Sequence, residues 1–268
     1  IMSDSRPIGV FDSGLGGLTV VKSLCSLLPN KSIVYFGDTA RVPYGNKSKE
    51  LILEYSKEIT DFLIKHDAKM VVVACNTASA LALDELQKHS PIPVLGVIKP
   101  GATEAIKATS NNHIGIIGTV ATISSKAYEK VLHGLNGNIQ TSSQACPLLV
   151  PLAEEGWLDG DVANTIVNHY LSPLNDNKID TLILGCTHYP LLKDVIASQI
   201  NDGTVLIDSA AAVARAVKKS LSDSDELNDS DEKGALTCFV SDIPMRFESV
   251  GQRFLGAPMD HVQTIHGI

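Results

Sequence analysis

Short runs of apolar residues alternate along this chain with longer amphipathic stretches. Most of the short runs are rich in Val and Ile and end at a glycine or a polar residue, which is typical of strands buried on both faces of a parallel sheet. The longer stretches, such as residues 49–66, place apolar residues at helical spacing. The pattern predicts strands over residues 8–11, 32–37, 70–74, 93–97, 113–118, 181–185, 204–208 and 236–240.

This alternation predicts an α/β fold with mostly parallel sheets and helices on both sheet faces. Two pairs of segments also resemble each other across the halves of the chain: residues 8–14 resemble 114–120, and residues 71–79 resemble 182–190. We therefore expect two similar, doubly wound α/β lobes with the active site in the cleft between them. The expected boundaries place residues 5–97 and 209–268 in the first lobe and residues 98–208 in the second.

Composition and charge narrow the class of protein. The chain has 268 residues, of which 44% are hydrophobic and 19% are charged, as in an ordinary globular protein. The formal net charge of −8 disfavours nucleic acid or an anionic membrane as a general partner. The sequence shows no signal segment or membrane-length apolar run, and its five cysteines favour a reducing compartment, so a cytoplasmic location is expected. We interpret the acidic run at residues 222–233 as a solvated, mobile loop.

The segments 71–79 and 182–190 each place a cysteine directly after an apolar run. Cys75 and Cys186 are thus expected at the carboxyl ends of two core strands, where open α/β sheets bind ligands. A free thiol is only roughly 3% ionised at pH 7, so it needs help to act as a base. A following helix can supply part of that help, with Thr77, Ser79 or Thr187 as caps. His188 can add positive charge beside Cys186.

The cysteines also allow two other interpretations. Cys25, Cys146 and Cys238 lie within apolar stretches or before a proline, so we expect them to have packing roles. A zinc site made of Cys75, Cys186 and His188 is chemically conceivable, but a Cys-x-His pair is not a usual ligand spacing and no CxxC accompanies it. No metal is therefore expected.

Two polar segments that follow strands are candidates for walls of the pocket. The glycine-rich exit at residues 11–17 can turn tightly and free amide groups to bind an anion at the following helix. Its spacing matches neither a phosphate-binding P-loop nor GxGxxG, so a plain turn capped by Asp12 and Ser13 remains an alternative. The exit at residues 37–46 is longer than a strand–helix turn needs, and Tyr44 in it is either a pocket wall or a surface-packed aromatic.

Seven motifs in order along the chain together resemble the glutamate racemases of the cofactor-independent aspartate/glutamate racemase family. The motifs are FDSGLGGLTV, GDTARVPYGNKS, VVACNTASA, GVIKPGA, IGTVATISS, CPLLVPLAEEG and LGCTHYPLL. The resemblance implies an isomerase that needs no cofactor and converts L-glutamate to D-glutamate for peptidoglycan synthesis. It implies that Cys75 and Cys186 are the two acid/base thiols, with Cys75 taking the proton from D-glutamate and Cys186 from L-glutamate.

The resemblance also assigns the remaining site residues. The residues implied to assist the thiols are Asp12, Glu154 and His188, with Glu155 as the neighbouring alternative to Glu154. The implied substrate contacts are Asp12, Ser13, Tyr44, Gly45, Asn76, Thr77, Thr187 and His188, and Thr119 and Thr122 are additional anchors. The implied partner is a small-molecule substrate, glutamate, with a homodimer left open.

Two alternatives to this function stay open. An aspartate racemase, or another two-thiol racemase or isomerase, would use the same thiol pair on a different substrate. A bilobal small-ligand binding protein would also hold its ligand in a cleft, but the paired thiols at strand ends disfavour that class. Racemisation assays with glutamate and aspartate distinguish the three.

Overall fold

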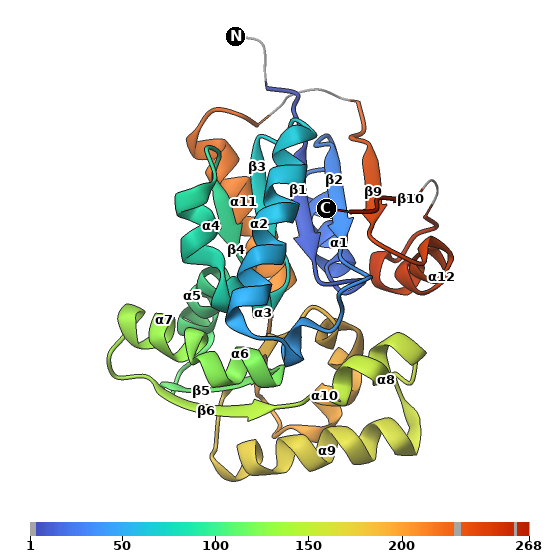
Figure 1. The fold of residues 1–268 in the computed structure, drawn as a ribbon. Helices are drawn as coiled ribbons and strands as arrows, with labels where there is room; N and C mark the ends of the chain where they lie inside the picture. The colour runs from blue at the N-terminus through green and yellow to red at the C-terminus, as the bar shows by residue number, and fades with distance from the viewer. Residues whose placement is uncertain (1–3, 228–231, 260–261, 268) are drawn as a thin grey trace.

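The computed structural model describes residues 4–227, 232–259 and 262–267, and its strands form two sheets (Figure 1). The six-stranded sheet contains β1 (Ile8–Asp12), β2 (Ile33–Gly37), β3 (Met70–Val73), β4 (Val94–Gly96), β9 (Leu236–Val240) and β10 (Val262–Thr264). The four-stranded sheet contains β5 (His113–Gly118), β6 (Gln140–Ala145), β7 (Thr181–Gly185) and β8 (Val205–Asp208). Every strand pairing between described residues is parallel, as predicted.

The two sheets repeat one topology. The first sheet has the order β10-β9-β2-β1-β3-β4 and the second the order β6-β5-β7-β8. The segment β2-β1-β3-β4 of the first sheet therefore corresponds strand by strand to the whole second sheet. This correspondence confirms the prediction of two similar α/β lobes.

Helices connect the strands and cover both faces of the sheets. They are α1 (Leu18–Leu27), α2 (Lys49–Lys65), α3 (Asn76–Leu81), α4 (Leu83–His89), α5 (Ile98–Ala108), α6 (Val120–Ser125), α7 (Ala127–Leu135), α8 (Leu149–Glu155), α9 (Gly160–Asp176), α10 (Lys193–Gln199), α11 (Ser209–Asp223) and α12 (Pro244–Leu255). Two short 3₁₀ helices, η1 (Tyr44–Asn46) and η2 (Tyr189–Leu192), follow β2 and β7. Within the described part of the chain, no helix has the length and apolar character needed to cross a bilayer.

Alternation along the central strands explains why both faces of the first sheet are covered. Val10 of β1 belongs to the larger hydrophobic core together with Leu24 of α1. Its neighbour Phe11 belongs to a second core together with Ile59 and Leu63 of α2. Successive side chains of a strand point to opposite faces, so a sheet covered on both sides needs an uninterrupted apolar run.

The structure adds two strands that the hydrophobic pattern does not predict. β6 reads QTSSQA, and its side chains are exposed or half-buried because it lies at an edge of the second sheet. β10 is only three residues long and lies at an edge of the first sheet. Edge strands need no apolar run, so neither strand gives the signal of a buried one.

The acidic run at 222–233 falls partly outside the described residues, which omit 228–231. Its first two residues belong to α11. Residues 222–225 are exposed, as expected of a solvated segment. Glu226 is half-buried, and its backbone carbonyl oxygen accepts a hydrogen bond of 2.6 Å from Lys31 Nζ. Among the described residues, the expectation of a loop is wrong for the two that belong to α11.

The boundaries between the lobes remain a prediction. β9 pairs with β2, so the C-terminal part of the chain returns to the first sheet. The strands of the second sheet all lie between residues 113 and 208. This distribution supports division near residues 97 and 209.

Candidate active site

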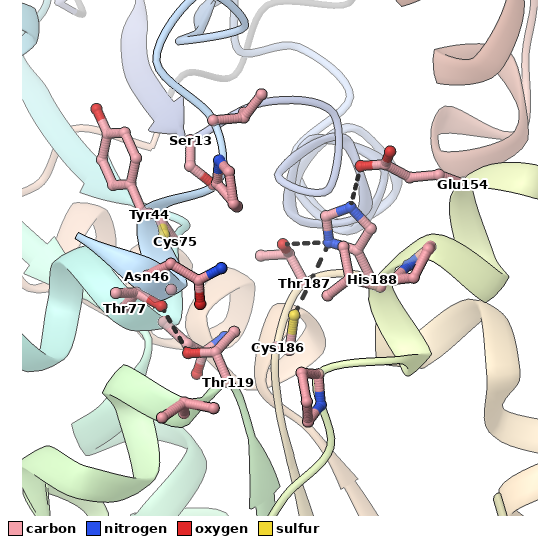
Figure 2. A pocket seen from close by; sticks show the side chains of 18 residues that line it. Ser13, Tyr44, Asn46, Cys75, Thr77, Thr119, Glu154, Cys186, Thr187 and His188 are labelled. Atoms are coloured by element: carbon pink, nitrogen blue, oxygen red, sulfur yellow. Dashed lines mark hydrogen bonds and ion pairs between the residues drawn. The ribbon is translucent and has the colours of Figure 1, made fainter. Parts of the chain in front are cut away.

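A cavity of about 380 Å³ lies where the carboxyl ends of strands from both sheets meet (Figure 2). Its lining comes from residues that follow β1, β2 and β3 of the first sheet and β5, β6 and β7 of the second. The lining residues are Ser13, Val42, Pro43, Tyr44, Gly45, Asn46, Cys75, Asn76, Thr77, Thr119, Val120, Pro147, Val150, Pro151, Glu154, Cys186, Thr187 and His188. Both predicted thiols thus line the same cavity.

Cys75 is the N-cap residue of α3, and its Sγ accepts a hydrogen bond of 3.5 Å from the Ala78 backbone N–H. The thiol is buried. Burial raises the pKa of Cys75 to about 12, and the nearby carboxylate of Asp12 acts in the same direction. A pKa this high favours the neutral thiol form of Cys75 at pH 7.

Cys186 follows β7 and begins a chain of polar contacts. Its Sγ lies 3.8 Å from His188 Nδ1, and His188 Nε2 lies 3.0 Å from Glu154 Oε1 (Figure 2). Burial opposes the charged form of His188, but the contacts with Cys186 and Glu154 outweigh it and raise the pKa of His188 to about 10. The hydrogen bond to His188 lowers the pKa of Glu154. An imidazolium between two acidic groups is therefore favoured.

Asp12 ends β1 and lies behind the cavity wall, because it is not among the lining residues. Its carboxylate accepts hydrogen bonds from the Gly14 backbone N–H at 3.0 Å and from Thr187 Oγ1 at 3.4 Å. Burial raises the pKa of Asp12, and the positive charge of His188 opposes this rise. Asp12 therefore links the first-lobe loop to the segment that holds Cys186, and a direct substrate contact remains a prediction.

Buried donors surround the space between the thiols. Tyr128 donates a hydrogen bond of 2.7 Å to Asn76 Oδ1, which fixes the orientation of that amide. Asn76 Nδ2 has no hydrogen-bond partner among the described residues. Thr77 and Thr119 bring their hydroxyls within 2.9 Å of each other across the cleft. Asn76 Nδ2 is therefore available to bind a polar ligand, because an unpaired buried donor is costly.

The second polar exit is shaped by Tyr44 and Gly45. The Tyr44 side chain is buried and its hydroxyl donates to Asp38, so the surface-packed alternative is wrong. A Cβ at position 45 would lie 3.1 Å from Thr119 Cβ in the other lobe. Glycine therefore lets this loop approach the second lobe closely.

Apart from Asp12 and the additional anchor Thr122, every catalytic, assisting or substrate-binding residue predicted from the sequence lines the cavity. Thr122 is buried beside the lining, with its hydroxyl 2.9 Å from that of Thr119. The lining also contains residues that have no individual assignment from the sequence, namely the apolar Val42, Pro43, Val120, Pro147, Val150 and Pro151 and the polar Asn46. Of these, Val42, Pro43 and Asn46 carried a usable signal, because they lie in the exit at residues 37–46 that was already a candidate pocket wall. Cys25, Cys146 and Cys238 lie outside the lining. No group of three potential metal ligands is found among the described residues.

Comparison with known proteins identifies the class. The family model for Asp/Glu/Hydantoin racemase matches residues 15–217. A curated glutamate racemase of Geobacter metallireducens is 50% identical over 260 residues, covering 97% of this chain and 96% of the relative. A glutamate racemase of Neisseria meningitidis is 48% identical over 261 residues, with the same coverage. The crystal structure of the Francisella tularensis glutamate racemase in complex with D-glutamate superposes with a TM-score of 0.91 at 42% identity, covering 97% of both chains.

The fold and these matches define an isomerase of the racemase class. The chain belongs to the Asp/Glu/Hydantoin racemase family, and the relatives named above are glutamate racemases.

Proposed function

We propose that this chain interconverts L- and D-glutamate by proton transfer between two thiols, without a cofactor. The observation that carries the proposal is the position of Cys75 and Cys186, which come from different lobes and line one cavity. A carbon acid held between them can lose its proton to one face and regain a proton from the other. That exchange inverts the α-carbon.

The charges around the two thiols suggest which form of the enzyme meets L-glutamate. Cys75 is held as a thiol by burial, whereas an imidazolium 3.8 Å from Cys186 Sγ stabilises negative charge on that sulfur. We therefore assign to the enzyme that meets L-glutamate a form with the base at Cys186 and the acid at Cys75. This is the form needed to convert L-glutamate to D-glutamate.

One turnover moves one proton onto Cys186 and another proton off Cys75. The Cys186 thiolate takes the α-proton of L-glutamate and becomes a thiol. The Cys75 thiol then donates its proton to the opposite face of the α-carbon and becomes a thiolate. D-glutamate leaves, and the two thiols regain their starting forms by exchange of one proton with solvent or by the reverse reaction.

The remaining lining has to stabilise charge on the substrate. None of the described residues that line the cavity is a lysine or an arginine. The two substrate carboxylates would therefore be bound by neutral donors, such as Asn76 Nδ2 and the hydroxyls of Ser13 and Thr77, and by backbone amides. Preorganised donors in a site that excludes water stabilise the charge that develops on the α-carboxylate as the proton leaves.

This activity would supply D-glutamate for peptidoglycan synthesis in the cytoplasm. The names of the relatives, and the D-glutamate in the Francisella complex, support glutamate over aspartate as the substrate. A homodimer is compatible with this function but not required by it, because one chain contributes both thiols.

The test is a racemisation assay followed by circular dichroism, with L-glutamate, D-glutamate and L-aspartate as separate substrates. We expect the enzyme, dialysed against a chelator and given no pyridoxal phosphate, to racemise both glutamate enantiomers fully. Preference for aspartate would favour the aspartate racemase alternative. Tight glutamate binding without racemisation would favour a binding protein, and activity that returns only with added metal or cofactor would contradict the cofactor-independent mechanism.

A further inference from the structure

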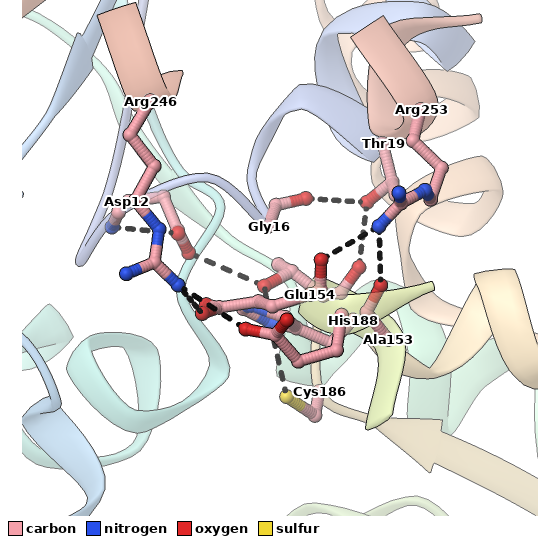
Figure 3. Close-up of polar contacts among 12 residues, drawn as sticks. Asp12, Gly16, Thr19, Ala153, Glu154, Cys186, His188, Arg246 and Arg253 are labelled. Atoms are coloured by element: carbon pink, nitrogen blue, oxygen red, sulfur yellow. Dashed lines mark hydrogen bonds and ion pairs between the residues drawn. The ribbon is translucent and has the colours of Figure 1, made fainter. Parts of the chain in front are cut away.

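Helix α12 of the first lobe contacts α8 of the second lobe through two arginines, Arg246 and Arg253 (Figure 3). Helix α8 carries Glu154, whose carboxylate lies 3.0 Å from His188 Nε2. The sequence motifs that identify the site do not include either arginine. Their contacts nevertheless converge on the residue that orients His188.

Arg253 binds the main chain at the end of α8. Its Nη1 donates hydrogen bonds to the backbone oxygens of Ala153 at 3.2 Å and of Glu154 at 2.6 Å. The last carbonyls of a helix have no partner in a following turn, so a cation there satisfies them and interacts favourably with the helix dipole. The guanidinium therefore fixes where α8 ends.

The chain makes room for this contact with a glycine. Gly156 follows α8 in the left-handed region, with φ of +78°, and a Cβ there would lie 2.8 Å from Arg253 Cζ. A side chain at position 156 would push the guanidinium away. The position of the Arg253 side chain, which belongs to the first lobe, is thus set by the main chain of the second lobe.

Arg246 interacts with α8 more weakly than Arg253 does. Its Nη2 lies 3.7 Å from Glu154 Oε2 and 3.6 Å from Glu155 Oε1, and its side chain is 56% exposed. Exposed ion pairs of this length contribute little. Phe254, in contrast, packs edge-on against the His188 ring with centroids 5.1 Å apart. The adjacent residues Arg253 and Phe254 of α12 therefore contact Glu154 and His188, the two partners of one hydrogen bond.

We propose that Arg253 is a positioning residue for the Cys186 half of the reaction, because it holds Glu154 and thereby sets His188 against Cys186. This inference rests on the proposed function. It also means that the first lobe helps to orient the acid/base group of the second lobe. Arg253 has no described contact with Cys75, so its effect should be confined to proton transfer at Cys186.

Activity alone cannot reveal that asymmetry. L- and D-glutamate have equal free energies, so any variant must change kcat/KM by the same factor in both directions. Deuterium isotope effects on kcat/KM, in contrast, can differ between the two directions. When transfer at Cys186 is slowed, the deuterium effect on kcat/KM rises for α-deuterated L-glutamate. For α-deuterated D-glutamate it falls toward the equilibrium value for moving deuterium from carbon to sulfur.

The experiment compares Arg253→Ala and Arg253→Lys with a matched control, Arg215→Ala. Arg215 is also an exposed arginine that bridges two helices, but it pairs with Glu104 at 3.2 Å, and neither residue lines the active-site cavity. We expect Arg253→Ala to lower kcat/KM about tenfold in both directions, since small misplacement of a reacting group is costly. In Arg253→Ala the isotope effect should rise for L-glutamate and fall for D-glutamate. Arg253→Lys should recover part of the lost kcat/KM and part of the change in the isotope effects. Arg215→Ala should match the wild type in both measurements.

The measured activity and isotope effects of Arg253→Ala test the positioning role of Arg253. Diverging isotope effects support the inference. Lower activity with both isotope effects unchanged, or no change at all, overturns it, because loss of folded enzyme lowers the rate without altering the rate-limiting proton transfer. Should thermal unfolding show that Arg253→Ala is not folded, the same criteria apply to Arg253→Lys. A wild-type enzyme that fails to racemise glutamate would instead contradict the proposed function.

Discussion

Cys75 and Cys186 occupy equivalent positions in the two lobes, because Cys75 follows β3 and Cys186 follows β7, the corresponding strands of the two sheets. Their surroundings nevertheless differ. Cys75 Sγ accepts a backbone N–H contact at 3.5 Å and interacts with the Ser13 side chain, whereas Cys186 Sγ faces His188 at 3.8 Å. The repeated fold thus places two thiols in matching positions, but a neutral hydroxyl lies beside one of them and an imidazole beside the other.

The first prediction concerns the path of the proton. In D₂O, newly formed D-glutamate should carry deuterium at the α-carbon from the start, while the remaining L-glutamate should carry almost none. The reason is that the proton leaves to Cys186 and deuterium arrives from Cys75 on the opposite face. Proton NMR of the α-position at low conversion measures both labels. Early labelling of both enantiomers together would point to a single base.

Serine variants provide the control for this path. Cys75→Ser and Cys186→Ser should each lower kcat/KM by at least about a hundredfold, because a hydroxyl is far harder to ionise than a thiol and acid–base catalysis contributes 10²–10⁴-fold. Each loss should be equal in the two directions. Near-normal turnover in Cys75→Ser, with activity lost only in Cys186→Ser, would sink the two-thiol mechanism.

The second prediction concerns thiol reactivity. Iodoacetamide at pH 7 should inactivate the enzyme by modifying Cys186 before Cys75, and glutamate should protect both. With its pKa raised to about 12 by burial, Cys75 should react about tenfold faster for each unit of pH above 7, because only the thiolate attacks. Peptide mapping against time identifies the modified residue.

Cys25, Cys146 and Cys238 are the internal controls for this experiment. Burial raises the pKa of each of these thiols. They lie outside the cavity, so glutamate should not change their reactivity. Inactivation that followed modification of one of these three would show that the catalytic pair is wrongly assigned.

Much of this arrangement could be predicted from the sequence, for identifiable reasons. Buried parallel strands need uninterrupted apolar runs, so β5, β7 and β9 begin and end where the pattern predicts them. The polar residue after such a strand must lie at the carboxyl edge of the sheet, which brings Cys75 and Cys186 to the cleft.

The remainder depends on contacts that no local pattern encodes. The polar edge strand β6 has no hydrophobic signal. The apolar cavity wall at Pro147 and Val150 becomes visible only when α8 is placed against the loops after β2 and β7. The hydrogen bond from Arg253 to the Glu154 backbone oxygen joins residues that lie 99 positions apart in the chain. Long-range contacts of this kind follow from the packing of the lobes.

The third prediction tests the contact between His188 and Glu154. Glu154→Gln removes the negative charge that helps to raise the pKa of His188 to about 10, so that pKa should fall. Because the imidazolium is then lost at a lower pH, the alkaline limb of the kcat/KM profile should move toward neutral pH, and the maximum should fall about tenfold. A pH–rate series measures both changes.

Glu155→Gln is the matched control. Glu155 is the next residue along α8, its side chain is 65% exposed, and its ion pair is with Arg246. Its replacement should leave the profile unchanged. A shift in Glu155→Gln instead of Glu154→Gln would mean that the neighbouring carboxylate is the working partner of His188.

The last prediction concerns Gly16, which lies under the Cys186 segment. A Cβ at this position would lie 2.2 Å from Thr187 Oγ1 and 2.5 Å from His188 Nδ1. Gly16→Ala must therefore displace the two residues that follow Cys186. We expect kcat/KM to fall about a hundredfold from misplacement of His188, and the free energy of unfolding to fall by about 1–3 kcal/mol from overpacking. Gly134→Ala in α7 is the control, because an added Cβ would have no neighbour within 4 Å beyond the adjoining residues and backbone of its own helix. A helical alanine there should stabilise the fold by about 0.5–1 kcal/mol. Racemisation kinetics and urea unfolding of the two variants measure the contrast. Wild-type activity in Gly16→Ala would show that the working enzyme does not keep the first-lobe loop this close to His188.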